Sequence, residues 1–491
     1  MHVHFVGVAG TGMASVAGLF RAAGHRVTGS DLVFLPPMGP ALERWGVETM
    51  TGYEPAHLDP RPDLVVVGNV CRRDNPEAQA AIEGGLAYTS MCHALADHVL
   101  EGTSPLVVAG THGKTTTTSL CAHLLQATGK DPGFLVGGLP KNFTTSFQLP
   151  KGHGARRLPI AGARRGTETG RLVPFVVEGD EYDTAFFEKT PKFWHYRPEV
   201  AIVTSIEHDH VDIYPDEAAY FAAFRGFIER IPPHGLIVAW CGDANVVTVV
   251  SESARAPIAW YAVEGDDYHG QPPHWLIAPA QGDGSGQSFD LYVGGSLAPR
   301  SALQLSGRHN LANAAAAIAA VCQGFGVSVQ SALSALPRFE GVARRQDLVG
   351  TPRGVRVYDD FAHHPTAVRE TLAGLRARHR EGRLVAVYEP RSATACRALH
   401  QAAYLEAFDP ATDVMLAPLG RDIPRSEALD LERLVSDLRG RGVRATLPGS
   451  LDAIVAALGG LVEPGDTVVL LSNGAFGGIA RRLLDSLASD A

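Results

Sequence analysis

Short apolar runs alternate along the chain with longer stretches in which apolar residues recur at helical spacing. In the first part of the chain the apolar runs fall at 2–8, 25–29 and 64–68, with helical stretches between them. Strands that alternate with helices in this way are typical of α/β proteins with parallel sheets. The pattern therefore predicts an α/β fold built on parallel sheets.

The same alternation continues in two further blocks, and a linker-like segment at 101–105 separates them from the first. The second block has predicted strands at 106–109, 174–177 and 200–206 and a closing alanine-rich helix at 310–325. The third block begins near Pro337 and has predicted strands at 355–358, 384–388, 413–416 and 467–471. We predict three domains, at 1–103, 104–336 and 337–491.

Two polar, glycine-rich stretches interrupt the central block. Residues 151–172 are basic and show little periodicity, which predicts a surface insertion. Residues 262–288 are typical of a hairpin region or a long loop.

Composition changes this picture little but excludes several classes of protein. A chain of 491 residues is too long for one hydrophobic core, and a net charge of −9 argues against a nucleic-acid or membrane surface. No apolar run approaches the roughly 18–20 residues of a membrane span, and the first residues lead directly into a strand, so we expect neither a membrane segment nor a signal peptide. The six cysteines lie far apart without a CxxC pair, which indicates reduced thiols in a cytoplasmic protein.

The most specific chemical motif is a glycine-rich loop between a predicted strand and a predicted helix. Its residues are Gly110, Thr111, His112, Gly113, Lys114, Thr115 and Thr116. Glycines let a backbone approach phosphates, a lysine reaches the β- and γ-phosphates, and a threonine hydroxyl joins a Mg²⁺ shell. Val108 stands where the full pattern G-x-x-x-x-G-K-[ST] has its first glycine. The strand, loop and helix together still predict ATP binding, with Lys114 at the phosphates.

Two further predicted strands of the central block end near acidic and imidazole side chains. Glu178 follows one of them, and His210 lies shortly after the other. Ligands of parallel sheets bind beyond the carboxyl ends of the strands, so both side chains should converge on the phosphate loop. A carboxylate and an imidazole there predict a Mg²⁺ site, in which histidine is the less usual ligand. Glu181 and His208 are equally well explained as solvated or structural residues.

A weaker glycine motif follows the first predicted strand. Gly10, Thr11 and Gly12 begin a G-x-G-x-x-G pattern that lacks its third glycine, and Asp31 stands where a dinucleotide-binding domain keeps its ribose acid. The same loop would equally suit the diphosphate of a UDP-sugar, or form only a tight turn. The residues alone leave these three interpretations open.

On these motifs the chain resembles the Mur ligases, which are ATP-dependent, amide-bond-forming enzymes of bacterial cell-wall metabolism. The shortened loop of that family, G-T-x-G-K-T, matches residues 110–115, and the resemblance extends over nearly the whole chain. It implies a Rossmann-like N-terminal domain that binds UDP-N-acetylmuramate and a central P-loop ATPase-type domain. A Rossmann-like C-terminal domain would bind the peptide substrate.

The resemblance also assigns roles to individual residues. The implied catalytic residues are Lys114, Glu178, His210 and Arg345, of which Glu178 and His210 hold the metal with Thr115. The implied ATP contacts outside the loop are Asn310 and Asn313 on the adenine side, Arg345 between domains, and Asp360 near the ribose or phosphates. The implied UDP-sugar contacts are Gly10, Thr11, Gly12, Met13, Ser30 and Asp31. The implied peptide contacts are Arg391, Ser392, Ser472 and Asn473.

Within the family, the chain is most similar to the branch that joins UDP-N-acetylmuramate to a preformed tripeptide, L-alanyl-γ-D-glutamyl-meso-diaminopimelate, in peptidoglycan recycling. The stretches that carry this similarity are 30–38, 179–187, 389–392 and 472–478. Gly179 stands where that branch usually has alanine. The implied partners are therefore UDP-N-acetylmuramate, ATP and the tripeptide, with Mg²⁺ as cofactor, no nucleic acid and no membrane. The implied state is a cytoplasmic monomer or weak oligomer.

Three other functions remain open at this point. A ligase of the same family that uses free L-alanine shares the fold and the first substrate. A nicotinamide-dependent oxidoreductase would use the N-terminal glycines but would leave the Lys114 loop unexplained. A nucleotide-binding regulator without catalysis would not require the metal-binding pair Glu178 and His210.

Overall fold

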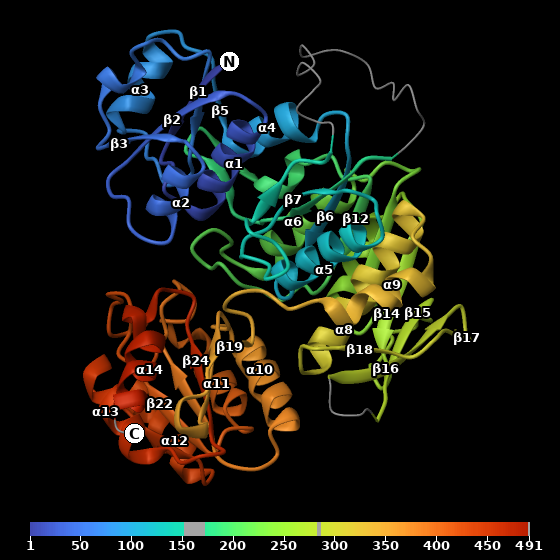
Figure 1. Cartoon of the computed structure of the whole chain (residues 1–491), viewed down its shortest axis with the longest axis vertical. Coiled ribbons are helices and arrows are strands. Elements are labelled where there is room, and N and C mark those ends of the chain that lie inside the picture. The colour runs from blue at the N-terminus through green and yellow to red at the C-terminus, as the bar shows by residue number, and fades with distance from the viewer. Residues whose placement is uncertain (152–171, 282–285, 490–491) are drawn as a thin grey trace.

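The computed structural model describes residues 1–151, 172–281 and 286–489. Most of the predicted insertion at 151–172 therefore lies outside the described residues. Three large sheets follow one another along the chain, and a two-stranded hairpin accompanies the central one. In Figure 1 the N-terminal part, in blue, and the C-terminal part, in orange to red, lie apart, and each lies beside the central part. The predicted α/β architecture with three domains is confirmed.

The N-terminal sheet has five parallel strands in the order β3-β2-β1-β4-β5. Its strands are β1 His2–Val6, β2 Arg26–Asp31, β3 Glu48–Thr51, β4 Leu64–Val67 and β5 Tyr88–Ser90. Its helices are α1 Thr11–Ala22, α2 Met38–Arg44, α3 Pro76–Glu83 and α4 Met91–Leu95, with short turns η1 Pro55–Leu58 and η2 Ala96–Leu100. Sequence analysis missed β3 and β5 because both are short edge strands without an apolar run.

Within the described residues, the central sheet has eleven strands, in the order β17-β16-β15-β14-β13-β12-β6-β9-β7-β8, with β18 beside β16. Its strands are β6 Ser104–Ala109, β7 Gly133–Leu135, β8 Phe147–Gln148, β9 Pro174–Glu178, β12 Val200–Val203, β13 Leu236–Trp240, β14 Ile258–Val263, β15 Trp275–Pro279, β16 Gln287–Val293, β17 Ser296–Leu297 and β18 Ser301–Leu303. The hairpin is β10 Asp183–Ala185 and β11 Glu188–Pro191. The helices are α5 Lys114–Ala127, α6 Glu217–Ile228, α7 Ala244–Ser253, α8 Arg308–Ala319 and α9 Val329–Ala335, with η4 Lys192–His195, η5 Ala320–Gly324 and η6 Leu336–Arg338.

The predicted parallel sheet forms the middle of the central domain, but the pairs at both of its edges are antiparallel. The strands from β15 to β7 are parallel, but β8, β16, β17 and β18 are antiparallel. The polar stretch at 262–288 contains β15 and the first residues of β16, so its hairpin prediction is confirmed. The predicted linker is shorter than expected, because Ser104 and Pro105 already pair with β9.

The C-terminal sheet has six strands in the order β19-β20-β24-β21-β22-β23, and all pairs except β19–β20 are parallel. The strands are β19 Asp347–Gly350, β20 Arg356–Asp360, β21 Leu384–Tyr388, β22 Asp413–Leu416, β23 Arg444–Thr446 and β24 Thr467–Leu471. The helices are α10 Pro365–Arg378, α11 Gln401–Ala407, α12 Leu431–Gly440, α13 Leu451–Leu461 and α14 Ile479–Ser489, with η7 Pro352–Gly354, η8 Ala398–His400 and η9 Phe476–Gly478. The antiparallel edge strand β19 was not predicted.

The central strands are buried on both faces, which makes them a rigid support for the loops at their ends. Along β12, Ala201 and Val203 pack into one hydrophobic core while Val200 and Ile202 pack into another. Successive side chains of a strand point to opposite faces, so both faces of this sheet are covered. Burial of each such valine or isoleucine contributes about 1.5–3 kcal/mol.

No helix in the described part of the chain combines the length and the apolar character that crossing a membrane requires.

Candidate active site

The predicted phosphate loop lies between β6 and α5. Gly110 and Gly113 have φ angles of +136° and +81°. A Cβ atom at Gly110 would lie 2.1 Å from Thr204 Oγ1, and one at Gly113 would lie 2.4 Å from Asn313 Oδ1, so both positions require glycine. Thr116 is buried in the first turn of α5. This helix begins without a side-chain N-cap, which leaves its first N–H groups for an anion.

Hydrogen bonds connect the loop to the residues that follow β12. The Thr111 N–H donates to the Ser205 carbonyl at 2.9 Å, and the His112 N–H donates to Ser205 Oγ at 3.0 Å. Thr204 Oγ1 donates to the His112 carbonyl at 2.5 Å. These bonds explain why β12 ends at Val203 and does not reach residue 206 as predicted.

Lys114 lies over the loop and forms a buried ion pair. Its Nζ donates to the Gly110 carbonyl at 2.6 Å and to both carboxylate oxygens of Glu181 at 2.9 Å. Burial would lower the pKa of Lys114, but the Glu181 charge outweighs that effect and the pKa is raised. Burial would likewise raise the pKa of Glu181, yet Lys114 and His210 hold it well below its usual range. Both groups are therefore charged at neutral pH.

His210 joins this ion pair from the chain after β12. Its Nε2 lies 3.0 Å from Glu181 Oε1, and its ring lies 4.3 Å from the ring of Tyr182. The residue has φ +56°, a conformation that residues other than glycine seldom adopt. Burial would lower the pKa of His210, but its hydrogen bond and charge interaction with Glu181 raise it. Sequence analysis did not recognise Glu181, because residue type alone does not reveal which carboxylate after β9 becomes buried.

Thr115 and Glu178 form a second pair beside the loop. Thr115 Oγ1 donates to Glu178 Oε1 at 2.8 Å, and the Gly137 N–H donates to Glu178 Oε2 at 2.7 Å. Arg345 Nη2 from the C-terminal domain donates to Thr115 Oγ1 at 3.2 Å. Burial, followed by the nearby Asp180 charge, raises the pKa of Glu178.

The predicted metal ligands are therefore brought to one region but divided between two hydrogen-bonded groups. Thr115 and Glu178 are in contact, and their oxygens are the donor type that Mg²⁺ prefers. His210 is instead bonded to Glu181. Among the described residues, these side chains do not form one cluster of converging ligand atoms. The donor chemistry fits Mg²⁺, and the three-residue ligand set stays a prediction.

Asp360 holds the segment that carries Arg345. Its carboxylate accepts hydrogen bonds from the Gln346 N–H at 2.6 Å and the Ala362 N–H at 2.8 Å. The Arg345 guanidinium lies 4.6 Å from the centre of the Phe361 ring. Burial raises the pKa of Asp360 and lowers that of Arg345. Asp360 thus positions the backbone around Arg345, and its predicted nucleotide contact stays a prediction.

The two predicted adenine-side asparagines lie on α8, next to the phosphate loop. Asn313 Nδ2 donates to Asn310 Oδ1 at 3.2 Å, and Asn310 Nδ2 donates to the Ser306 carbonyl at 2.7 Å. Thr117 Oγ1 donates to Asn313 Oδ1 at 3.1 Å. The pair therefore links α8 to α5, and its contact with adenine stays a prediction.

Glu207 connects the loop to the C-terminal domain, a role that sequence analysis missed. Its Oε2 lies 2.8 Å from His112 Nε2, and Thr366 Oγ1 donates to its Oε1 at 2.9 Å. His364, whose ring lies 4.9 Å from that of His112, is buried without a hydrogen-bond partner among the described residues. Burial and the His112 charge lower the pKa of His364 to about 3, so this imidazole is neutral at pH 7.

The N-terminal glycine motif lies between β1 and α1, at the carboxyl end of the first sheet. Gly10 precedes the helix, whose first residues are Thr11, Gly12 and Met13. The Asp31 carboxylate accepts from the Ala9 N–H at 2.8 Å and from the Tyr53 hydroxyl at 3.2 Å, while the neighbouring Ser30 Oγ is buried without a partner among the described residues. Strand order reverses between β1 and β4, which is where parallel sheets bind ligands. The UDP-sugar contacts stay predictions.

The predicted peptide contacts lie together beyond the adjacent strands β21 and β24. Ser472 Oγ donates to Glu389, and Arg391 Nη1 lies 3.7 Å from Glu389 Oε1. The Ser392 hydroxyl accepts from the Ala395 N–H at 3.0 Å. The Asn473 side-chain oxygen is buried without a partner among the described residues. Arg391 is half exposed, so its guanidinium is available to a carboxylate.

Comparison with known proteins shows a match to one family along all three parts of the chain. The Mur ligase family catalytic domain matches residues 2–102, the Mur ligase middle domain matches 108–321, and the Mur ligase glutamate ligase domain matches 344–474.

Individual relatives match over their full length. The UDP-N-acetylmuramate–L-alanyl-γ-D-glutamyl-meso-2,6-diaminoheptandioate ligase of Escherichia coli is 36% identical over 492 residues, which cover 100% of this chain and 99% of the relative. The UDP-N-acetylmuramate–L-alanine ligase of a Roseiflexus species is 34% identical over 506 residues, covering 99% of each chain. The crystal structure of a murein peptide ligase from Psychrobacter arcticus is 35% identical, covers 99% of each chain and superposes with a TM-score of 0.71.

Proposed function

The chain belongs to the Mur ligase family, and we propose that it joins UDP-N-acetylmuramate to the tripeptide L-alanyl-γ-D-glutamyl-meso-diaminopimelate in an ATP-dependent reaction. The observation that carries the acceptor assignment is the full-length similarity to ligases named for this tripeptide. The oxidoreductase and regulator alternatives do not account for the loop at Lys114 with its buried carboxylate and the arginine of another domain.

In the proposed reaction, an oxygen of the lactyl carboxylate attacks the γ-phosphorus of ATP, giving an acyl phosphate and ADP. The alanine amine of the tripeptide then attacks the acyl carbon, and the tetrahedral intermediate collapses to the amide and inorganic phosphate. Both steps concentrate negative charge on phosphoryl oxygens, so catalysis depends on charge stabilisation and positioning. Lys114 and Arg345 supply positive charge from two different domains.

Mg²⁺ is the proposed cofactor, and when bound it would neutralise phosphate charge. Thr115 and Glu178 would hold it through oxygen atoms, with His210 as the further ligand. The Thr115 hydroxyl already donates to Glu178 and accepts from Arg345, so this residue connects the metal ligands to the C-terminal domain.

We assign the three steps of recognition to three domains, at 1–103, 104–336 and 337–491. UDP-N-acetylmuramate would bind at the Gly10–Gly12 loop, ATP at the Lys114 loop, and the tripeptide beside Arg391, Ser392, Ser472 and Asn473. We place the reaction in the cytoplasm, where ATP is available and where cysteines stay reduced; all six cysteines are unpaired. We propose a monomer or weak oligomer.

The acceptor assignment is tested by phosphate release with two acceptors, because the L-alanine ligase of the Roseiflexus species is nearly as similar in sequence. With UDP-N-acetylmuramate and ATP fixed, we expect kcat/KM for the tripeptide to exceed that for L-alanine at least about a hundredfold, which corresponds to about 2.7 kcal/mol. Equal or faster turnover with L-alanine would reassign the enzyme to the L-alanine branch.

A Gly474→Ala substitution should impair use of the tripeptide selectively. A Cβ at Gly474 would lie 2.2 Å from Arg391 Cδ, so this arginine must move out of its present position. We expect the KM for the tripeptide to rise about tenfold or more, while the KM for ATP changes little. Gly449→Ala is the matched control, because no atom lies within 4 Å of its added Cβ. An unchanged tripeptide KM in Gly474→Ala would remove Arg391 from the peptide site.

A further inference from the structure

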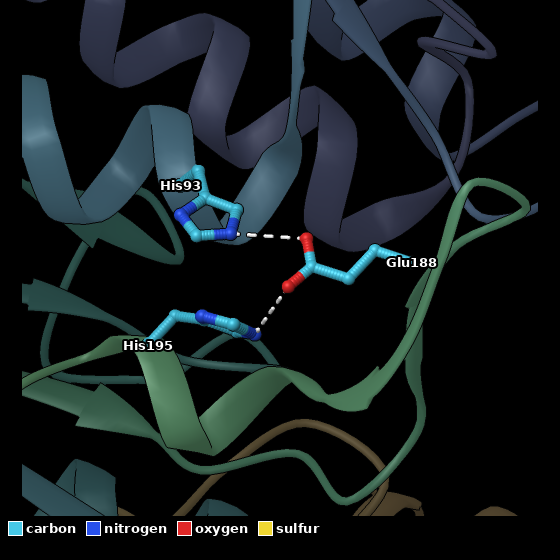
Figure 2. Close-up of side chains that lie close together, drawn as sticks. All are labelled: His93, Glu188 and His195. Carbon is cyan, nitrogen blue, oxygen red and sulfur yellow. Dashed lines mark hydrogen bonds and ion pairs between the residues drawn. The ribbon is translucent and has the colours of Figure 1, made fainter.

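Three side chains converge at the contact between the N-terminal and central parts of the chain. His93 lies on α4, Glu188 begins β11, and His195 ends η4. Figure 2 shows the Glu188 carboxylate beside the two imidazole rings, with one oxygen directed toward each ring. His93 Nε2 lies 3.0 Å from Glu188 Oε2, and His195 Nε2 lies 3.5 Å from Glu188 Oε1. The centroids of the two imidazole rings lie 4.2 Å apart.

The distances suit ligands of one small metal ion. One ligand atom from each residue lies within 4.8 Å of the other two. Tetrahedral coordination with bonds of about 2.0–2.1 Å separates neighbouring ligand atoms by about 3.3 Å. Each imidazole nitrogen lies close to this spacing from one of the two carboxylate oxygens, His93 Nε2 at 3.0 Å from Oε2 and His195 Nε2 at 3.5 Å from Oε1.

We propose that His93, Glu188 and His195 form a binding site for a divalent transition-metal ion of the Zn²⁺ type, which joins the N-terminal domain to the central domain. A set of two imidazole nitrogens and one carboxylate oxygen suits Zn²⁺, Co²⁺ and related ions better than it suits Mg²⁺. The exposed fractions of the His93, Glu188 and His195 side chains are 34%, 28% and 15%, so an ion has access from solvent.

The surroundings favour a ligand-competent state of these side chains. Thr190 Oγ1 donates to Glu188 Oε1 at 3.1 Å and lies 2.9 Å from His195 Nε2. Such a hydroxyl orients the carboxylate and the ring around a metal.

This site is separate from the proposed Mg²⁺ site and does not rest on the proposed ligase reaction. Its residues come from α4, β11 and η4, whereas the Mg²⁺ ligands come from α5, the end of β9 and the chain after β12. An ion pair between Arg197 and Asp97, at 2.7 Å, also joins the two parts of the chain. An ion bound by His93 and His195 would add a second and stronger connection between them.

The test is the metal content of the full-length protein. Protein stripped with a chelator is titrated with Co²⁺ and then with Zn²⁺, and bound metal is measured by elemental analysis and by the absorption of bound Co²⁺. We expect the unmodified protein to bind about one equivalent more than His93→Ala, Glu188→Gln and His195→Ala. Because each of these variants lacks a direct ligand, the affinity for that equivalent should fall at least about tenfold.

His234→Ala serves as the matched control, because His234 is an exposed histidine elsewhere in the central part of the chain. It should retain the full metal content. Thermal unfolding of the metal-free proteins checks that the variants are folded. If a histidine variant does not fold, Glu188→Gln still tests the site, because glutamine has nearly the same shape as glutamate. Retention of the additional equivalent by any folded ligand variant, or its absence from the unmodified protein, would overturn the proposal.

Discussion

Replacing Lys114 with alanine is expected to lower the rate of amide formation by at least about a thousandfold, while binding of UDP-N-acetylmuramate survives. The Lys114 ammonium is the positive charge of the phosphate loop, and no other lysine bonds to the loop in the described part of the chain. The proposed sugar-nucleotide loop belongs to a different sheet. Phosphate release measures the first effect, and calorimetric titration with UDP-N-acetylmuramate measures the second.

The same substitution removes the partner of a buried carboxylate and therefore lowers the stability of the fold. This loss of stability has to be separated from the loss of catalysis. Glu181 is fully buried and bonds to both Lys114 and His210. Breaking a buried pair in this way costs about 3–5 kcal/mol of stability. The double variant Lys114→Ala/Glu181→Gln should regain stability but remain inactive. Lys151→Ala is the control and should have the stability and activity of the original protein, since Lys151 is exposed. Full ligase activity in Lys114→Ala would refute the assignment of the loop.

Replacing Arg345 with alanine should lower kcat by about a thousandfold with a smaller effect on the KM for UDP-N-acetylmuramate. Its guanidinium reaches from the C-terminal domain to Thr115 and stacks near Phe361. An arginine supplied by a second domain stabilises phosphoryl charge only when the domains are closed, so its effect falls on the chemical step. Single-turnover measurement of ADP formation reads this step directly.

Two further variants complete this test, one that separates charge from shape at position 345 and one that serves as a control. Arg345→Lys keeps the charge but loses the planar fork, so we expect intermediate activity. Arg353→Ala removes an exposed arginine of the same domain and should leave kcat unchanged. If Arg345→Ala turned over as fast as the Arg353→Ala control, the contact with Thr115 would have no part in catalysis.

The sequence predicted those parts of the fold in which local pattern and tertiary environment agree. Continuous apolar runs such as 384–388 become strands that are buried on both faces, and β21 has the predicted bounds. The edge strands β3, β5, β19 and β23 escaped prediction because an edge strand buries few side chains and needs no apolar run. The antiparallel edges of the central sheet were missed for a related reason, since β8, β17 and β18 have only two or three residues each and are too short to show a hydrophobic pattern.

In the candidate site, too, some residues could be predicted from the sequence and others could not. The loop from Gly110 to Thr115 was recognisable because a short motif, a strand and a helix occur together. The roles of Glu181 and Glu207 depend on contacts across more than sixty residues of sequence, with Lys114 in one case and with His112 and Thr366 in the other. No spacing rule anticipates such contacts, because they arise only when the carboxyl ends of several strands meet at one edge.

The central claim is that the γ-phosphate of ATP is passed to the lactyl carboxylate before the amide forms. It is tested most directly with UDP-N-acetylmuramate that carries ¹⁸O in both oxygens of this carboxylate. Attack on ATP leaves one of these oxygens in the bridge of the acyl phosphate, and collapse to the amide releases it with the phosphate. Mass spectrometry of the released phosphate should therefore find one ¹⁸O atom in each molecule formed together with amide. Unlabelled phosphate, formed at the same rate as the amide, would contradict the account.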